Sequence, residues 1–218
     1  YLDTAPDLSG LPEPCLFDEA EGDAPLADFV RVGFNDPLYI LYSSGTTGAP
    51  KCIVHGVGGV TLQHAKELRL HSDVRPEDRL FFFTTCGWMM WNWVVSGLMV
   101  GTPVILYEGN PFHPGPDRLW QMVEAERLTH MGVSAKYVDA VRNAGYLPGQ
   151  NVDLSALRMI MSTGSPLSAE AFEFIYRDVS PSLQLCSISG GTDLISCFVL
   201  GTPTQPVHAG EIQSRGLG

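Results

Sequence analysis

The longest run without a charged residue extends from Leu80 to Tyr107, and it restricts the folds that this chain can adopt. Its 28 positions would suffice for a membrane span, which needs about 20 apolar residues. Gly, Asn, Ser, Thr and Pro interrupt the run, however, where strands would turn into helices. We therefore expect three buried pieces, a strand over 79–85, a helix over 89–99 and a strand over 103–107, and no membrane span. Continuously apolar strands are typical of a parallel sheet that is covered on both faces.

The rest of the chain alternates between apolar runs of strand length and segments of helical periodicity. Strands are expected over 38–42, 52–55, 130–133, 157–162 and 183–188, and helices over 60–71, 120–128, 135–144 and 168–177. This alternation predicts an α/β fold with a largely parallel sheet flanked by helices.

Residues 1–36 form a separate, acidic segment. They hold nine carboxylates against the single arginine Arg31, contain several prolines and show neither helical nor strand periodicity. We expect an extended leader over 1–36 and the α/β unit over 37–218. The formal net charge is −11, and the leader carries most of it, so the remainder has no basic face for a phosphate backbone. Nucleic-acid binding is excluded on this ground.

The five cysteines are scattered, form no C-x-x-C pair and build no zinc spacing with histidine. They are therefore expected to be free thiols in a reducing compartment. The first residues show no basic segment followed by an apolar one, so no signal peptide is expected. Together these features predict a cytoplasmic location.

The segment Tyr42–Lys51 has the composition of a phosphate-binding loop. Its positions 43–48 combine four hydroxyl side chains with two glycines directly after an apolar run. Backbone N–H groups in such a loop form an anion-binding nest, and Lys51 adds a positive charge. A Ser/Gly surface linker is the alternative, which the flanking apolar strands disfavour. A Walker-type loop is excluded, because the glycine spacing differs and Cys52 follows the lysine.

The motif S-S-G-T-T-G-x-P-K resembles the phosphate loop of the adenylate-forming enzymes, which include the acyl-CoA synthetases. Four further segments resemble motifs of that family, in the family's order: Cys86–Met89, Ser162–Pro166, Ser189–Asp193 and Gly210–Ile212. The resemblance covers 39–218, and within the family the residues of these motifs are most similar to those of the acetoacetyl-CoA synthetase branch. It implies the family's α/β domain and an AMP-forming acid–thiol ligase of lipid and ketone-body metabolism.

The resemblance also implies ATP, Mg²⁺ and coenzyme A as cofactors and co-substrates, with acetoacetate as the acid that is activated. By position, the expected catalytic residues are Lys51 on the β- and γ-phosphates, Thr192 on the α-phosphate and Asp193 on Mg²⁺. Asp193 is one methylene shorter than the family's glutamate, so a metal contact through water is possible. The expected ATP-binding residues are Ser43, Ser44, Gly45, Thr46, Thr47, Gly48, Lys51, Gly164, Ser165, Pro166, Gly191 and Thr192.

By the same resemblance, Trp88, Met89, Met90, Thr163 and Gly190 are expected to line the acyl pocket. Gly190 stands where acetyl-CoA synthetases carry a tryptophan, so its missing side chain would make room for the longer acetoacetate. The alternative is that Gly190 merely supplies a positive φ angle in a tight loop. The Thr163 hydroxyl is expected to donate to the β-ketone of the acid.

Family members also carry an aspartate, a hinge and a small lysine-bearing domain that follow these motifs, and this sequence contains none of them. We therefore expect the chain to be the central part of the nucleotide-binding domain, inactive by itself. Two alternatives remain open at this point. One is a ligase for a different short carboxylate, and the other is a non-catalytic nucleotide-binding module.

Overall fold

A computed structural model of the chain describes residues 9–10, 12, 28–43, 48 and 50–218. Its contacts divide the chain into two units, Tyr1–Val32 and Gly33–Gly218. The division falls four residues before the boundary expected from the sequence, which stays a prediction. The second unit holds the helices, the strands and the candidate site.

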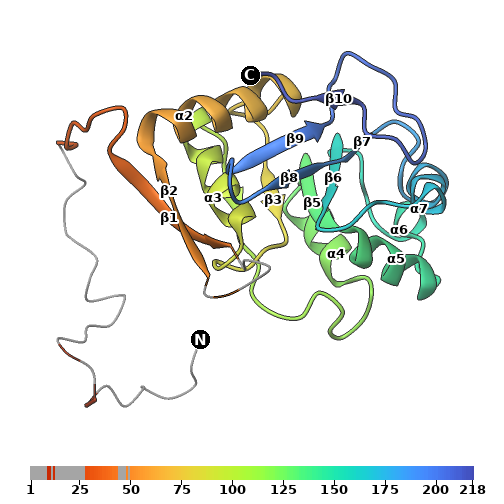
Figure 1. Ribbon diagram of the computed structural model, residues 1–218. Helices are drawn as coiled ribbons and strands as arrows, with labels where there is room; N and C mark the ends of the chain where they lie inside the picture. Colours follow the sequence, from red (N-terminus) through yellow and green to blue (C-terminus); the bar gives the residue numbers. More distant parts are fainter. Residues whose placement is uncertain (1–8, 11, 13–27, 44–47, 49) are drawn as a thin grey trace. The chain divides into compact units, whose positions relative to one another are not determined.

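The centre of the second unit is a five-stranded sheet with all strands parallel, in the order β4-β3-β5-β6-β7 (Figure 1). The strands are β3 (Leu80–Phe82), β4 (Val104–Ile105), β5 (His130–Ser134), β6 (Met159–Thr163) and β7 (Gln184–Ser187). The expectation of an α/β fold with a largely parallel sheet is thereby confirmed.

Helices cover both faces of this sheet. On one face lie α4 (Arg118–Ala125), α5 (Ala135–Asn143), α6 (Pro148–Asn151) and α7 (Ala169–Phe174), the last continued by the π-helical turn η3 (Ile175–Val179). On the other face lie α2 (Val57–Lys66), its π-helical continuation η1 (Glu67–His71), α3 (Met89–Val95) and the 3₁₀ turn η2 (Ser96–Val100).

The uncharged run therefore folds as strand, helix and strand, as its glycines and prolines indicated. Among the residues that the structure describes, no helix has both the length and the apolar character that a membrane crossing requires.

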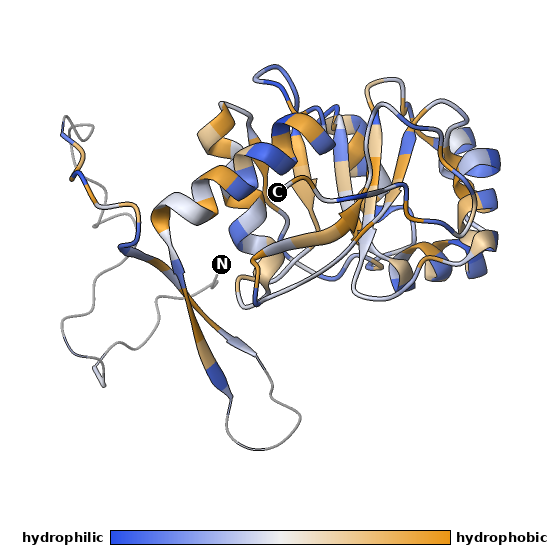
Figure 2. Ribbon diagram, turned by 45° about the horizontal axis from the view of Figure 1, so that its top comes forward, coloured by the Kyte–Doolittle hydropathy of each residue, from blue (hydrophilic) through white to orange (hydrophobic). Residues whose placement is uncertain are grey.

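Alternate residues of each strand enter different cores, as the pleat of a strand requires. Phe81 packs with the helices on the α4–α5 face, whereas Phe82 packs on the α2–α3 face. Gly132 on the neighbouring strand leaves room for the Phe82 ring, because a Cβ there would lie 1.9 Å from it. Figure 2 shows the strands of the sheet as predominantly hydrophobic, while the helices alternate between polar and apolar residues. Two-sided burial thus explains the lack of charge in the strands.

Two smaller antiparallel sheets complete the unit. The first pairs β1 (Pro37–Ser43) with β2 (Lys51–Gly56), and Tyr39 and Leu41 turn its inner face toward the α2–α3 core. The second has the order β10-β9-β8 and contains β8 (Ser189–Gly191), β9 (Ser196–Leu200) and β10 (Ser214–Arg215). This second sheet was not predicted from the sequence.

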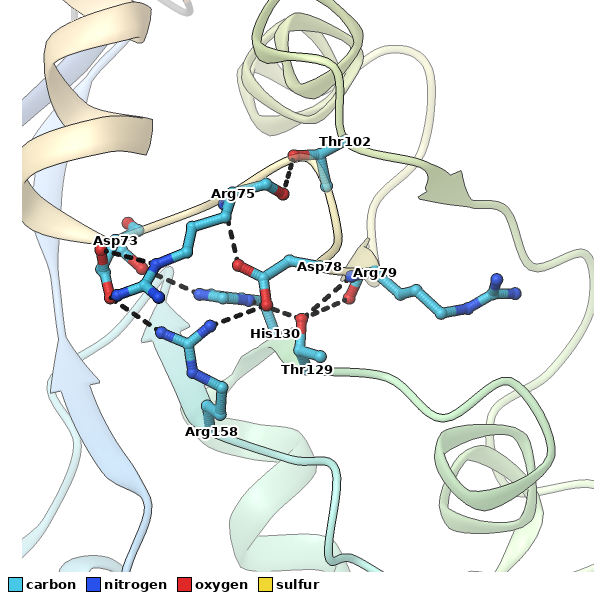
Figure 3. A network of polar contacts seen from close by, with 9 residues as sticks. Asp73, Arg75, Asp78, Arg79, Thr102, Thr129, His130 and Arg158 are labelled. Carbon is cyan, nitrogen blue, oxygen red and sulfur yellow. Dashed lines mark hydrogen bonds and ion pairs between the residues drawn. The ribbon is translucent and has the colours of Figure 1, made fainter.

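A polar network joins the amino ends of three parallel strands (Figure 3). Arg158, just before β6, donates to Asp73 and to Asp78, each at 2.8 Å. Asp78 also accepts the backbone N–H of Arg75 at 2.8 Å, and its carboxylate is almost fully buried. Close by, His130 Nε2 contacts the Ser72 carbonyl at 2.8 Å. These contacts fix the end of the sheet that lies opposite the candidate site.

Candidate active site

A cavity of about 540 Å³ opens at the carboxyl ends of the parallel strands, and because of this position we call it the main cavity. Thr163 ends β6, Ser187 ends β7, and Trp88 directly precedes α3, and all three line the cavity. Ligands of open α/β sheets bind at this edge, outside the carboxyl ends of the strands. The fold therefore places the cavity where a substrate site is expected.

Segments that the sequence analysis selected separately meet in this cavity, although they are far apart in the chain. One comes from the start of α3, one from the loop after β6 and one from β8 and the residue after it. The expected site residues that line the cavity are Trp88, Met89, Met90, Thr163, Gly164, Ser165, Pro166, Gly190, Gly191 and Thr192.

The loop after β6 is shaped by two local features. Gly164 has a φ of +91°, which favours glycine, and no atom lies within 4 Å of a Cβ built there. At the other end of the loop Ser168 is the N-cap of α7, because its hydroxyl accepts the Ala171 N–H at 3.3 Å. The segment therefore caps a helix and also leaves open space above its backbone for a flat ligand.

Thr192 lines the cavity, and hydrogen bonds to its carbonyl hold its backbone in place. Its carbonyl accepts a hydrogen bond from His55 Nε2 at 2.8 Å and another from the Ile195 N–H at 3.3 Å. Within the described part of the chain, no residue hydrogen-bonds the Thr192 hydroxyl, which can thus donate to a ligand. His55 is the penultimate residue of β2, so this contact also ties the hairpin of the phosphate-loop motif to the cavity wall.

Asp193 is exposed and lines a second hollow of about 510 Å³, next to His55 and Gln63, rather than the main cavity. No group of three or more His, Cys, Asp or Glu side chains that could hold a metal occurs among the described residues. A single carboxylate nevertheless fits Mg²⁺, which in phosphate-transferring sites is held by one or two carboxylates, substrate phosphates and water.

The phosphate-loop motif connects two antiparallel strands. Ser43 ends β1 and faces Lys51 at the start of β2, and Lys51 is exposed. Gly48 has a φ of +110°, and no atom lies within 4 Å of a Cβ built there. Ser44, Gly45, Thr46 and Thr47 lie outside the described residues. A strand–loop–strand connection differs from the strand–loop–helix of Walker-type loops, in agreement with the exclusion made from glycine spacing. Ser43, Gly48 and Lys51 do not line the main cavity.

Comparison with known proteins identifies the family. Residues 4–214 match the family described as AMP-binding enzyme. The chain belongs to the AMP-binding enzyme family.

Individual relatives are similar over most of this AMP-binding chain. An acetoacetyl-coenzyme A synthetase of Rhizobium meliloti (strain 1021) is 56% identical over 209 residues, which are 91% of this chain and 32% of that protein. A malonamoyl-CoA synthetase of Penicillium aethiopicum is 45% identical over 205 residues, which are 88% of this chain and 28% of that protein. The solved acetoacetyl-CoA synthetase of Streptomyces lividans matches with a TM-score of 0.84 and 46% identity, over 91% of this chain and 31% of that one. The chain thus spans about a third of the length of these relatives.

Helix α3 forms one wall of the cavity in this AMP-binding chain, at the end where the acyl pocket is expected, which we call the acyl end. Met89 and Met90 are buried, and Trp88 stands edge-on to Phe82 with ring centroids 6.0 Å apart. Trp93 is buried in the core behind this wall. The wall is apolar and adaptable, which suits a short carbon chain.

The Thr163 hydroxyl is already engaged, so the expectation that it donates to a β-ketone is wrong for this structure. Thr163 Oγ1 donates to the Ile188 carbonyl at 3.0 Å. A hydroxyl has one proton, so toward a ligand this side chain can only accept.

Gly190 lacks a positive φ angle, so that explanation of the glycine is wrong. A Cβ on Gly190 would lie 1.9 Å from the Ser196 carbonyl oxygen and 2.7 Å from Cys197 Cα. The glycine is required because β9 approaches β8 closely, and this approach fixes the width of the cavity on that side. Any side chain at position 190 would therefore overlap the β9 backbone, and the expectation that Gly190 makes room for a longer acid stays a prediction.

Sequence reasoning assigned no site to a further group of cavity residues, which lie in the loop after β6, from the end of β7 to the start of β8, on β9 and after β9. Burial raises the pKa of the Cys197 thiol far above its ordinary value, so this thiol is neutral and lines the wall without acting as a nucleophile. Gly210 and Ile212 belong to a motif that the sequence analysis had selected without assigning them a site. The cavity residues that were not expected are Leu167, Ser187, Ile188, Ser189, Ser196, Cys197, Gly210 and Ile212.

Proposed function

We propose that the whole protein containing this chain is an AMP-forming acetoacetate-CoA ligase. The observation that carries the proposal is the single cavity in which the loop after β6, Thr192 and the apolar wall of α3 meet. The similarity to acetoacetyl-CoA synthetases at 56% identity supports the acid. In this reaction a carboxylate oxygen attacks the α-phosphorus of ATP and pyrophosphate leaves. The thiol of coenzyme A then attacks the acyl carbon and AMP leaves.

The residues of the chain take complementary roles in the first step. The loop Gly164–Pro166 accommodates the adenine, and the unpartnered Thr192 hydroxyl donates to a non-bridging oxygen of the α-phosphate. Charge grows on that oxygen during attack, so a fixed donor stabilises the transition state more than the ground state. Residues 43–48 and Lys51 hold the β- and γ-phosphates. Asp193 holds Mg²⁺, which when bound neutralises phosphate charge.

The acid lies against Met89 and Met90 with its carboxylate toward Thr192. A second candidate is another short acid with a carbonyl at the β-position, such as malonamate. The similarity to a malonamoyl-CoA synthetase at 45% identity favours it, and the Thr163 oxygen would accept a hydrogen bond from an amide N–H of such an acid. A cytoplasmic location and a place in lipid and ketone-body metabolism follow as part of the proposal.

The test is an exchange of labelled pyrophosphate into ATP by the whole protein, with acetoacetate, malonamate and acetate compared. Exchange that depends on acetoacetate supports the proposal, and a larger kcat/KM for malonamate supports the second candidate. Thr192→Val should lower exchange by about 10²–10³-fold, as loss of one transition-state donor does in other enzymes. If the protein binds nucleotide but shows no pyrophosphate exchange in the presence of any of these acids, it is a non-catalytic nucleotide-binding module instead.

A further inference from the structure

Glu67 places a carboxylate in the core directly behind the acyl end of the cavity. It is the first residue of the π-helical turn η1, and only 1% of it is exposed. Its Oε2 accepts the indole N–H of Trp93 at 2.9 Å. Its Oε1 accepts the backbone N–H of Cys197 at 3.0 Å and the hydroxyl of Ser196. A polar group this deep is retained in a protein only where its partners satisfy it.

The donors belong to the two elements that form the acyl wall. Trp93 lies on α3, one turn after Met89 and Met90, which line the cavity. Ser196 and Cys197 lie on β9, line the cavity themselves and pair with Gly191 and Gly190. Glu67 is thus the bridge between the two sides of the acyl end. A small void lined by Glu67, Met90 and Cys197 separates it from the main cavity, so Glu67 does not contact the acid.

The bridge requires a carboxylate rather than an amide. The Trp93 indole and the Cys197 backbone can only donate, and they approach different oxygens of Glu67. A glutamine of the same shape accepts at one of these positions and presents N–H to a donor at the other. Since one donor is then unpaired in the core, α3 or β9 must move away.

We infer that Glu67 is a positioning residue that sets the width of the acyl end and thereby the choice among short carboxylic acids. The inference rests on the proposed function for the existence of an acid substrate. It assigns no contact with the acid to Glu67, whose effect passes through α3 and β9. The nucleotide end, at Gly164–Pro166, is not attached to this bridge and should be unaffected.

The experiment compares Glu67→Gln with the wild-type whole protein in the pyrophosphate-exchange assay. The expected result is a fall of at least tenfold in kcat/KM for acetoacetate, with a changed ratio of acetoacetate to acetate and a KM for ATP within twofold. Glu126→Gln is the matched control, because Glu126 pairs with Arg79 on the surface and should change none of these quantities.

A second pair of variants separates positioning from general damage to the fold. Trp93→Phe keeps an aromatic ring and removes the N–H donor together with part of the indole volume, so it should shift the acid ratio in the same direction. In the double variant Glu67→Gln/Trp93→Phe, the glutamine oxygen can accept the Cys197 N–H while the glutamine amide N–H no longer faces the indole N–H. Part of the acetoacetate activity should therefore return. If Glu67→Gln does not fold, the ratio of acetoacetate to acetate measured for Trp93→Phe tests the inference by itself.

The outcomes distinguish this inference from the proposed function. If the wild type is active and both Glu67→Gln and Trp93→Phe keep the wild-type ratio of acetoacetate to acetate, the inference is overturned and the proposed function stands. If the wild type activates a different acid, the ratio is measured with that acid and its homologue one methylene longer. A wild type that activates no acid overturns both.

Discussion

Replacing Gly190 by alanine should separate β8 from β9 and destabilise the protein. A Cβ at Gly190 would lie 1.9 Å from the Ser196 carbonyl oxygen and 2.7 Å from Cys197 Cα. These are backbone atoms of a paired strand, so no rotation of a side chain relieves the overlap. Ordinary contact begins near 3.4 Å, and the two strands would have to part by more than 1 Å.

The magnitude follows from the nature of the obstacle. Extra methyl groups in packed sites cost about 1–3 kcal/mol where side chains can adjust. Because the obstacle here is a strand backbone, we expect the upper end, about 3 kcal/mol. With a slope of about 2 kcal/mol per molar urea, the unfolding midpoint falls by about 1.5 M. The exchange activity should fall as well, since Thr192 follows β8 directly.

Gly191→Ala is the matched control on the same strand. The atoms nearest to its added Cβ lie at 3.7–3.9 Å, which is ordinary contact, and its φ is not positive. Its urea midpoint should stay within about 0.5 M of the wild type, because an alanine tolerated by the backbone changes stability by about 0.4–1 kcal/mol at most. Equal midpoints for the two variants would refute the argument that close strand approach requires Gly190.

Two further predictions concern histidines. His55→Ala removes the donor to the Thr192 carbonyl and should lower kcat/KM for ATP by about 5–10-fold, the effect of one hydrogen bond, in the exchange assay. Burial lowers the pKa of His64 and of His130 below the ordinary 6.5, so both rings stay neutral in the folded state while the unfolded chain binds protons below pH 6.5. Stability should therefore be fully present above pH 6.5 and decline as the pH falls through the lowered values, which urea midpoints at pH 7.5, 6.5 and 5.5 will measure.

The parallel sheet could be predicted from the sequence because its strands are apolar on both faces and are separated by turn residues. The expected site residues converge for a related reason. Thr163 ends one strand, and the segments around Trp88 and Thr192 follow others, so all lie near the carboxyl edge of the sheet.

The second antiparallel sheet could not be predicted, because its strands are extended only when they pair with one another. β8 is Ser-Gly-Gly, which has no intrinsic strand preference, and it is extended only because β9 pairs with it. Ser196 and Cys197 were missed for this reason, since nothing in the sequence brings them to the cavity. Glu67 was missed because one helical period was expected over 60–71, whereas the structure turns π-helical at Glu67 and directs its carboxylate inward. Such turns occur frequently at functional sites.

Arg158 gives a test of the opposite end of the sheet, where stability and activity should separate. Its guanidinium donates at 2.8 Å to Asp78, which is 2% exposed, and at 2.8 Å to Asp73 on the surface (Figure 3). Bonds from Arg75 and Arg158 hold the pKa of Asp73 below its usual range, so Asp73 is charged at neutral pH.

Arg158→Ala should cost about 2 kcal/mol, between the 0–1 of surface pairs and the 3–5 of fully buried ones. The reason is that 41% of the Arg158 side chain is exposed, so water enters beside Asp78 when it is removed. Arg75→Ala is the matched control, because it removes only a surface contact to Asp73 and leaves the backbone N–H to Asp78 in place. The urea midpoint should fall by about 1 M for Arg158→Ala and by less than half of that for Arg75→Ala. The KM for ATP should be unchanged in both, since the cluster lies at the amino ends of the strands and the cavity at the carboxyl ends. Equal midpoints, or a changed KM in a folded Arg158→Ala protein, would show that the two ends of the sheet are not independent.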